Sequence, residues 1–172
     1  KYDLAIVEDA AHALGATYGN GEKVGNCQYS DMTCFSFHPV KGIAAGEGGM
    51  VTTNNPETYH KLTLLRSHGI TKGNFEFPGI SKADASLINK DYALENGELK
   101  RWYYEMQHLG YNYRITDIQC ALAISQMDKI DLFLDARKSM AKVYDKAFKD
   151  IPNITPLQSF GRDNSSHHIY VV

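Results

Sequence analysis

The sequence lacks several features that would assign it directly to a class of protein. No apolar run approaches the roughly 18 residues that a membrane-spanning helix needs, and 18 basic against 20 acidic residues give a formal net charge of only −2. A near-neutral chain offers no electrostatic attraction for nucleic acid or for an anionic membrane surface. Cysteine is scarce, with three residues and no C-x-x-C spacing. We therefore expect a cytoplasmic protein with reduced thiols and with no nucleic-acid or membrane partner.

Short apolar segments predict an α/β protein. Residues 2–7 form an apolar run that ends at acids, which is typical of a fully buried strand. Residues 32–37 and 49–53 are two further strand-like segments, and the turn-rich loop 17–25 separates them from the first. A last strand is predicted to begin near His168. Strands that are followed by helices in this way favour an α/β architecture.

Two regions carry helix signals. The segment 57–67 has a proline at its start, where proline is tolerated. The segment 117–148 keeps a helical period, with a break near Met127, and Thr116 is a good N-cap with the glutamine of a capping box three residues later. Between these regions, residues 69–103 show no clear period. A loop of that length is typically either functional or mobile.

One lysine stands in an unusual setting. Lys41 follows the strand-like segment and Pro39, and it precedes the glycine-rich run Gly42-Ile43-Ala44-Ala45-Gly46-Glu47-Gly48-Gly49. A lysine after a strand is usually a solvated surface residue. A fixed approach and some desolvation, however, lower the pKa of a lysine and make its amine a nucleophile. The flanking residues therefore indicate a lysine that forms a Schiff base.

An acid stands at the end of the first predicted strand. Asp9 lies in Glu8-Asp9-Ala10-Ala11-His12, and ligands bind at the carboxyl ends of strands in open α/β sheets. Asp9 could cap the small-residue segment that follows it, or it could hold the proton of a pyridinium ring. Ala10 and Ala11 would leave space for a flat ring. An acid on one strand and a lysine after the next suggest one pocket and one cofactor.

Other polar residues have both a structural and a functional interpretation. His12 could be a core histidine or a ring contact, and Ser36 could be an ordinary strand hydroxyl or a phosphate ligand. Asn112 and Arg114 lie between aromatic residues just before a predicted helix, where anions bind, although a structural turn explains the same residues. His167-His168 has no further ligands at metal-binding spacing, so we predict no metal site.

Four motifs together resemble one family. They occur in the order found in the sugar-nucleotide aminotransferases of the DegT/DnrJ/EryC1/StrS group, and their joint occurrence is far more specific than any one of them. The segment from Arg101 to Gln107 is most similar to the pseudaminic-acid branch of that family. The motifs are Glu8-Asp9-Ala10-Ala11-His12-Ala13-Leu14-Gly15, Ser36-Phe37-His38-Pro39-Val40-Lys41, Gly46-Glu47-Gly48-Gly49 and Gly110-Tyr111-Asn112-Tyr113-Arg114-Ile115-Thr116-Asp117.

The resemblance implies a type I aminotransferase fold with pyridoxal 5'-phosphate as cofactor. It implies that Lys41 forms the Schiff base with the cofactor and that Asp9 pairs with the pyridine nitrogen. His12 would lie beside the ring, and Ser36 would bind the cofactor phosphate or nearby substrate. Asn112 would reach the cofactor phosphate in the neighbouring subunit of a homodimer with shared active sites.

The remaining candidates would contact the substrate. His168 matches a segment of the family that contacts the site, while Arg114 is an anion contact proposed from its position before a helix. Ala44-Ala45 departs from a pair that is commonly rich in threonine, which could change a hydrogen bond at that turn.

The implied reaction moves an amino group from L-glutamate to C4 of a UDP-linked 4-keto-6-deoxy-N-acetylhexosamine, in pseudaminic-acid-type sugar biosynthesis. Two alternatives stay open: another nucleotide-4-ketosugar aminotransferase of the same family, or a non-catalytic regulatory or assembly protein that keeps the fold. A dehydratase branch of the family has histidine in place of the lysine, and Lys41 argues against it.

The domain organisation is also an expectation from the resemblance. Residues 1–126 would be the C-terminal part of the cofactor-binding large domain, with an insertion or long loop at 69–103. Residues 127–172 would be the connecting helix and the start of the small domain. Because the chain begins in a strand-like segment without methionine, we expect a fragment of a longer protein that binds the cofactor poorly alone.

Overall fold

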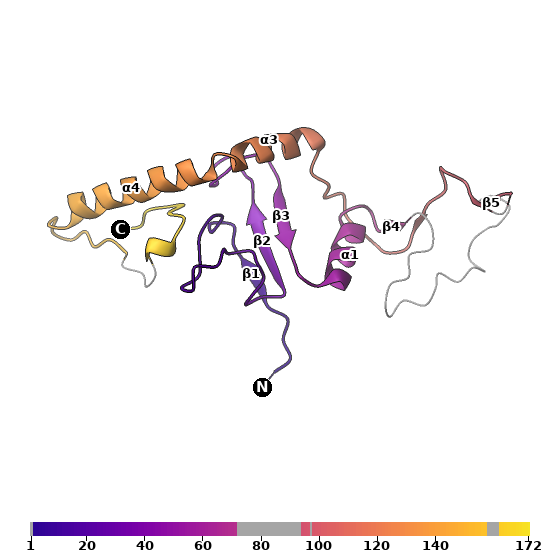
Figure 1. Cartoon of the computed structure of the whole chain (residues 1–172), viewed down its shortest axis with the longest axis horizontal. Coiled ribbons are helices and arrows are strands. Elements are labelled where there is room, and N and C mark those ends of the chain that lie inside the picture. Colours follow the sequence, from indigo (N-terminus) through magenta and orange to yellow (C-terminus); the bar gives the residue numbers. More distant parts are fainter. Residues whose placement is uncertain (1, 72–93, 97, 158–161) are drawn as a thin grey trace. The chain divides into compact units, whose positions relative to one another are not determined.

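The chain forms two compact units in the computed structural model, which describes residues 2–71, 94–96, 98–157 and 162–172. One unit is Lys1–Asn54 with Ile115–Val172, and the other is Asn55–Arg114. The first unit holds β1 (Val7–Asp9), β2 (Met32–Ser36), β3 (Gly49–Thr52), α3 (Asp117–Met127), α4 (Ile130–Phe148) and a short 3-10 turn at Arg162–Asn164 (Figure 1). The second unit holds α1 (Pro56–Leu65), β4 (Ile70–Thr71), β5 (Leu94–Glu95), β6 (Glu98–Leu99) and β7 (Glu105–Met106).

The first unit contains a mixed three-stranded sheet in the order β1-β2-β3, which confirms the predicted α/β class. β1 runs parallel to β2 with Asp9 opposite Cys34, and β3 runs antiparallel to β2 with Gly49 opposite Ser36. A Cβ atom on Gly49 would lie 2.6 Å from the Phe35 carbonyl oxygen, so the close approach of β3 requires glycine there. The parallel pairing brings the ends of β1 and β2 to the same edge of the sheet.

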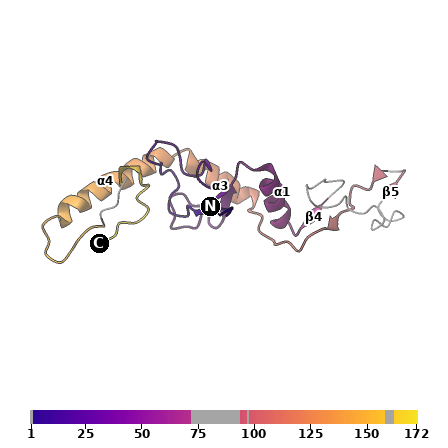
Figure 2. The same cartoon turned by 90° about the horizontal axis from the view of Figure 1, so that it is seen from below.

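The core of the first unit lies beside this edge. Its buried side chains are Ala10, Phe35, Phe37, Ile43, Ala45 and Ala123. Ile115, Ile130 and Phe133 pack against them from the start of α3 and the start of α4, which follow one another past the sheet (Figures 1 and 2). Burying a phenylalanine side chain contributes about 1.5–3 kcal/mol. The core therefore fixes the segments on both sides of Lys41.

The helix starts follow the local sequence signals. The Asn55 side chain accepts hydrogen bonds from the backbone N–H groups of Glu57 and Thr58 at the start of α1, which has proline in its first turn. Thr116 and Gln119 form the predicted capping box of α3. α3 ends at Met127 and α4 begins at Ile130, which confirms the predicted break.

Two predicted strands are wrong. The segment 2–7 is not a fully buried strand, because β1 covers only Val7–Asp9 and the side chains of Leu4 and Ile6 are 73% and 54% exposed. The apolar side chains before β1 therefore lack a covering layer among the described residues. The strand predicted from His168 is absent, since residues 168–172 have no regular structure and Val171 accepts a single backbone hydrogen bond from Leu157.

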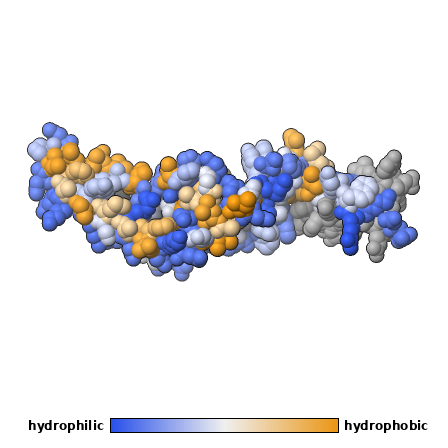
Figure 3. Space-filling view, turned by 90° about the horizontal axis from the view of Figure 1, so that it is seen from above, coloured by the Kyte–Doolittle hydropathy of each residue, from blue (hydrophilic) through white to orange (hydrophobic). Residues whose placement is uncertain are grey.

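The apolar stripe of the helices is only partly buried. In α4 the buried residues are Leu134 and Ala141, whereas Val143 is 64% exposed. On the side where α3 and α4 lie, apolar patches interrupt the polar surface (Figure 3). Ile118 at the start of α3 is 83% exposed. Most of the insertion expected at 69–103 lies outside the described residues.

Candidate functional site

Lys41 lies in a turn that is fixed on both sides. The Phe37 N–H donates to the Gly48 carbonyl at 2.8 Å, and the Ala45 N–H donates to the Phe37 carbonyl at 3.0 Å. Phe37 and Ile43 are buried on either side of the turn, while Lys41 itself is half-buried. The Lys41 N–H donates to the His38 carbonyl at 2.9 Å. The lysine backbone is therefore held while its side chain stays accessible.

Polar groups brace the same turn. The Ser36 Oγ accepts the His38 N–H at 3.4 Å, and the His38 Nδ1 accepts the Val40 N–H at 3.4 Å. The other ring nitrogen of His38 lies 4.0 Å from a carboxylate oxygen of Glu47. Gln119 donates from Nε2 to the Glu47 carbonyl at 3.1 Å, so the capping box of α3 also supports the turn.

Asp9 occupies the last position of β1, two residues beyond the end of the predicted strand 2–7. Its Oδ1 accepts the Ala11 N–H at 3.0 Å, which is the structural capping interaction considered for it. The Asp9 side chain is exposed at the same sheet edge as Ser36, because both are the last residues of parallel strands. A capping contact on one oxygen leaves the acid available for a further role.

A carboxylate network next to Asp9 was missed by the sequence analysis. The Tyr18 hydroxyl lies 2.6 and 2.8 Å from the two carboxylate oxygens of Glu8, and the Thr33 hydroxyl donates to Glu8 at 3.1 Å. Burial and the hydrogen bond to Glu8 raise the pKa of Tyr18 to about 12. Thr33 is fully buried. This network ties β1 to β2 from the side opposite Asp9, since neighbouring strand residues point to opposite faces.

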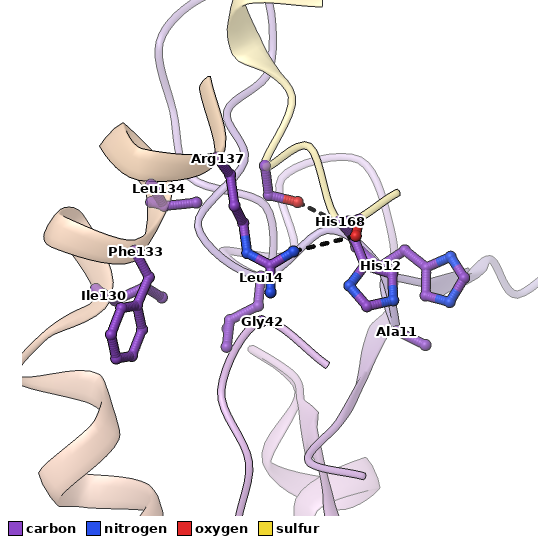
Figure 4. Close-up of a pocket in the computed structure, with 10 residues that line it drawn as sticks. Ala11, His12, Leu14, Gly42, Ile130, Phe133, Leu134, Arg137 and His168 are labelled. Carbon is purple, nitrogen blue, oxygen red and sulfur yellow. Dashed lines mark hydrogen bonds between the residues drawn. The ribbon is translucent and has the colours of Figure 1, made fainter. Parts of the chain in front are cut away.

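His12 and His168 meet although they are 156 positions apart in the chain. Their ring centroids lie 4.3 Å apart with the planes tilted by 41°. The Ser166 hydroxyl donates to the His12 carbonyl at 2.7 Å, and Arg137 donates from Nη1 to the His168 carbonyl at 3.1 Å (Figure 4). Burial lowers the pKa of His168, and the charges of His12, Lys41 and Arg137 lower it further. The buried Nδ1 of His168 has no hydrogen-bond partner in the described part of the chain.

A pocket lies between α4 and these histidines. The residues that line it include His12, Leu14, Gly42, Phe133, Arg137 and His168 (Figure 4). Arg137 was not singled out from the sequence. The available signal was its spacing: it stands four positions after Phe133 and three after Leu134, which places it on the same face of the helix.

Asn112 and Arg114 belong to the second unit. Asn112 forms an isolated antiparallel bridge with Ser67, and the rings of Tyr111 and Tyr113 stack with centroids 4.8 Å apart. Asn112 and Arg114 are both exposed. The structure thus shows the aromatic setting of these two residues, while their predicted anion contacts stay a prediction.

Three features of the described residues bear on other functions. Within residues 2–71, 94–96, 98–157 and 162–172, no group of three or more His, Cys, Asp or Glu side chains is arranged to hold a metal ion. Among the helices that the structure describes, none has both the length and the apolar character to cross a membrane. All three cysteines are free.

Comparisons with known proteins agree on one family. The family model described as the DegT/DnrJ/EryC1/StrS aminotransferase family matches residues 1–172. The chain is 38% identical over 172 residues to the UDP-4-amino-4,6-dideoxy-N-acetyl-beta-L-altrosamine transaminase of Campylobacter jejuni, covering 100% of this chain and 38% of the relative. The chain therefore spans well under half the length of that curated relative.

Solved structures give the same result. The Helicobacter pylori aminotransferase PseC, involved in the biosynthesis of pseudoaminic acid, matches with a TM-score of 0.75 and 35% identity over 97% of this chain and 37% of that chain. An E. coli GDP-4-keto-6-deoxy-D-mannose-3-dehydratase with bound hydrated PLP matches with a TM-score of 0.74 and 27% identity over 98% and 39% of the two chains. The chain belongs to the DegT/DnrJ/EryC1/StrS aminotransferase family, and its fold is part of the α/β fold of these enzymes.

Proposed function

We propose that the protein carrying this chain transfers an amino group from L-glutamate to C4 of a UDP-linked 4-keto-6-deoxy-N-acetylhexosamine, in pseudaminic-acid-type sugar biosynthesis. The observation that carries the proposal is Lys41, half-buried in a turn that is anchored on both sides and that follows the strand paired with the Asp9 strand. The similarity to the Campylobacter jejuni transaminase supports the choice of substrate.

The residues around Lys41 fit pyridoxal 5'-phosphate. An amine and a carboxylate follow adjacent strands, and the small residues Ala10 and Ala11 stand between Asp9 and His12. The buried Nδ1 of His168 has no partner among the described residues and could accept a hydrogen bond or donate one. When bound, the cofactor supplies an electron sink that makes the C–H bond beside the transferred nitrogen acidic.

The proposed roles follow from the chemistry of each side chain. Lys41 holds the cofactor covalently, and its amine removes and returns the transferred proton once it is released. Asp9 keeps the ring nitrogen protonated, because a carboxylate next to a cation favours the charged form. His12 contacts the ring, and Ser36 binds the cofactor phosphate or nearby substrate.

The other contacts extend to the substrate and to a second subunit. His168 and Arg114 contact the substrate in this proposal, and Asn112 reaches the cofactor phosphate of the neighbouring subunit in a cytoplasmic homodimer. Exposed apolar side chains such as Ile118 on α3 support an association of this kind. Residues 1–126 then belong to the large domain, and residues 127–172 lead into the small domain.

The cofactor and the lysine are tested first. The full-length protein is purified with its bound chromophore, reduced with borohydride and digested, and we expect the peptide containing Lys41 to carry the pyridoxyl phosphate group. The Lys41→Ala variant should retain less than about one hundredth of the wild-type rate, beyond the usual general-base contribution. Lys61, an exposed lysine of α1, gives the control variant Lys61→Ala, which should stay near wild type.

The substrate is tested on a panel of UDP- and dTDP-linked 4-ketosugars with glutamate. Amination of the UDP-linked N-acetylhexosamine with the highest kcat/KM is the expected result. Preference for a dTDP-linked sugar would favour another aminotransferase of the family. A protein that binds no pyridoxal phosphate and aminates no sugar would instead be a regulatory or assembly protein.

Shared active sites are tested by mixing inactive subunits. Lys41→Ala and Asn112→Ala variants are combined under conditions in which subunit exchange is verified. If sites are shared, each hybrid dimer has one site with both changes and one with neither, so activity returns. Absence of recovery from two impaired parents would contradict the role of Asn112 and leave the aminotransferase proposal standing.

A further inference from the structure

A cationic pocket lies next to Lys41, on the side where α4 begins. Gly42, the residue after Lys41, lines this pocket together with His12, Arg137 and His168. The apolar side chains of Leu14, Phe133 and Leu134 line the rest of it (Figure 4). The pocket thus combines one guanidinium and two imidazole rings with an apolar wall.

Arg137 is the charged group of this pocket, and none of the carboxylates in the described residues serves as its counter-ion. Its one hydrogen bond in the described part of the chain runs from Nη1 to the His168 carbonyl at 3.1 Å, and it forms no ion pair with a described carboxylate. Arg162 is a contrasting case, because its Nη2 lies 2.6 Å from Asp145 and its guanidinium stacks on Tyr170. Half-buried guanidinium groups are normally paired in this second way.

The charges that neighbour Arg137 add to the excess of positive charge at this pocket. Lys41 forms no ion pair with a described carboxylate either, and both Lys41 and Arg137 lie close enough to His168 to act on its charge. The Asp9 carboxylate, two residues before the pocket residue Ala11, is held by the Ala11 N–H. A pocket lined by a guanidinium, two imidazoles and no acid, with the Lys41 turn beside it, favours an anionic ligand.

The chemistry of the pocket narrows the class of anion. A guanidinium has five donors in a planar fork, and one of them is used by His168, so neighbouring donors remain for a two-oxygen acceptor. The apolar wall suits a short aliphatic stem more than a bare inorganic ion. We infer that Arg137 binds a carboxylate of the amino donor, an amino dicarboxylate, while that donor reacts with the cofactor that Lys41 would hold. This inference rests on the proposed aminotransferase function.

The test uses glutarate, a five-carbon dicarboxylate without an amino group. Its affinity for the full-length holoenzyme is measured by calorimetry for wild type, Arg137→Gln, Arg137→Lys and a control. Lys142→Gln is the control because Lys142 is an exposed cation on the same helix. We expect Arg137→Gln to weaken glutarate binding by about tenfold or more, the factor typical of losing one good polar interaction. Lys142→Gln should change it by less than about twofold.

Arg137→Lys keeps the charge but loses the fork, so an intermediate loss is expected, and this variant also serves if Arg137→Gln does not fold. Three results would overturn the inference: no binding of glutarate to wild type, unchanged affinity in both Arg137 variants, or competition by inorganic phosphate together with loss of cofactor from these variants. The last result would make the pocket a phosphate site. If Arg137 had only a structural role, its replacement would raise the KM for glutamate and the KM for the ketosugar alike. We expect only the KM for glutamate to rise.

The outcome is separable from the proposed function. A protein that binds glutarate through Arg137 but aminates no ketosugar refutes the proposed function and keeps the carboxylate site. A protein that aminates ketosugars with an Arg137-independent affinity for glutarate refutes this inference alone.

Discussion

Replacing Tyr18 by phenylalanine should destabilise the first unit by a predictable amount. The change removes one hydroxyl that donates to the Glu8 carboxylate at 2.6–2.8 Å and keeps the ring that packs edge-on against Tyr29 at 4.9 Å. A hydrogen bond to a charged group contributes about 1.5–3 kcal/mol. Because the Thr33 hydroxyl still donates to Glu8 and Tyr18 is only half-buried, we expect the lower end, about 1.5–2 kcal/mol.

The assay is urea unfolding of the full-length protein, read as the midpoint of the transition that includes the first unit. A lower midpoint with an unchanged slope indicates lost stability without a change in exposed surface. Tyr59→Phe is the control, because Tyr59 is 58% exposed in α1. A double-mutant cycle with Glu8→Gln isolates the Tyr18–Glu8 coupling. Equal midpoints for Tyr18→Phe and Tyr59→Phe would refute the reasoning.

The pH dependence of this prediction has a definite sign. The folded state raises the pKa of Tyr18 from 10.0 to about 12. A raised pKa means that the protonated hydroxyl is the stabilised form, so its contribution is complete below pH 10.0 and is lost as the pH rises towards 12. The difference between Tyr18→Phe and wild type should therefore stay constant from neutral pH to about pH 9.

Three further predictions concern the site. The Asp9→Asn variant should fold normally, because an amide oxygen can still accept the Ala11 N–H. It should react severely more slowly with glutamate in a single-turnover measurement of the half-reaction. A near-normal rate would remove Asp9 from its role. Gln119→Ala should lower stability by about 1 kcal/mol through loss of the capping box and of the hydrogen bond to the Glu47 carbonyl. The urea midpoint is compared with that of Ser125→Ala, a change at an exposed position of the same helix. Burial lowers the pKa of His168 below 6.5, so stability should fall as the pH drops below 6.5, and His168→Gln should flatten a plot of Tm against pH.

Local signals in the sequence predicted much of the framework. The capping box of α3, the proline in the first turn of α1 and the break after Met127 all appear in the structure at the predicted places. These features depend on hydrogen bonds and dihedral angles within a few residues, so neighbouring residues are sufficient to specify them. An acid at one strand end and a lysine after the next suggested a shared pocket, whereas the parallel pairing of the Asp9 strand with the Ser36 strand came from the structure.

Tertiary structure alone decided the contacts between distant segments. The Ser166 hydroxyl reaches the His12 carbonyl across 154 positions, and Arg137 reaches the His168 carbonyl across 31. No periodicity in the sequence encodes such pairs, because each depends on where α4 packs. Burial is decided in the same way: the apolar run 2–7 predicts a buried strand, yet Leu4 is 73% exposed, since burial requires a covering layer as well as an apolar side chain. The sequence by itself determined which chemical groups Lys41 and Asp9 provide. The fold determined which distant charged residues, Arg137 among them, lie beside the Lys41 turn.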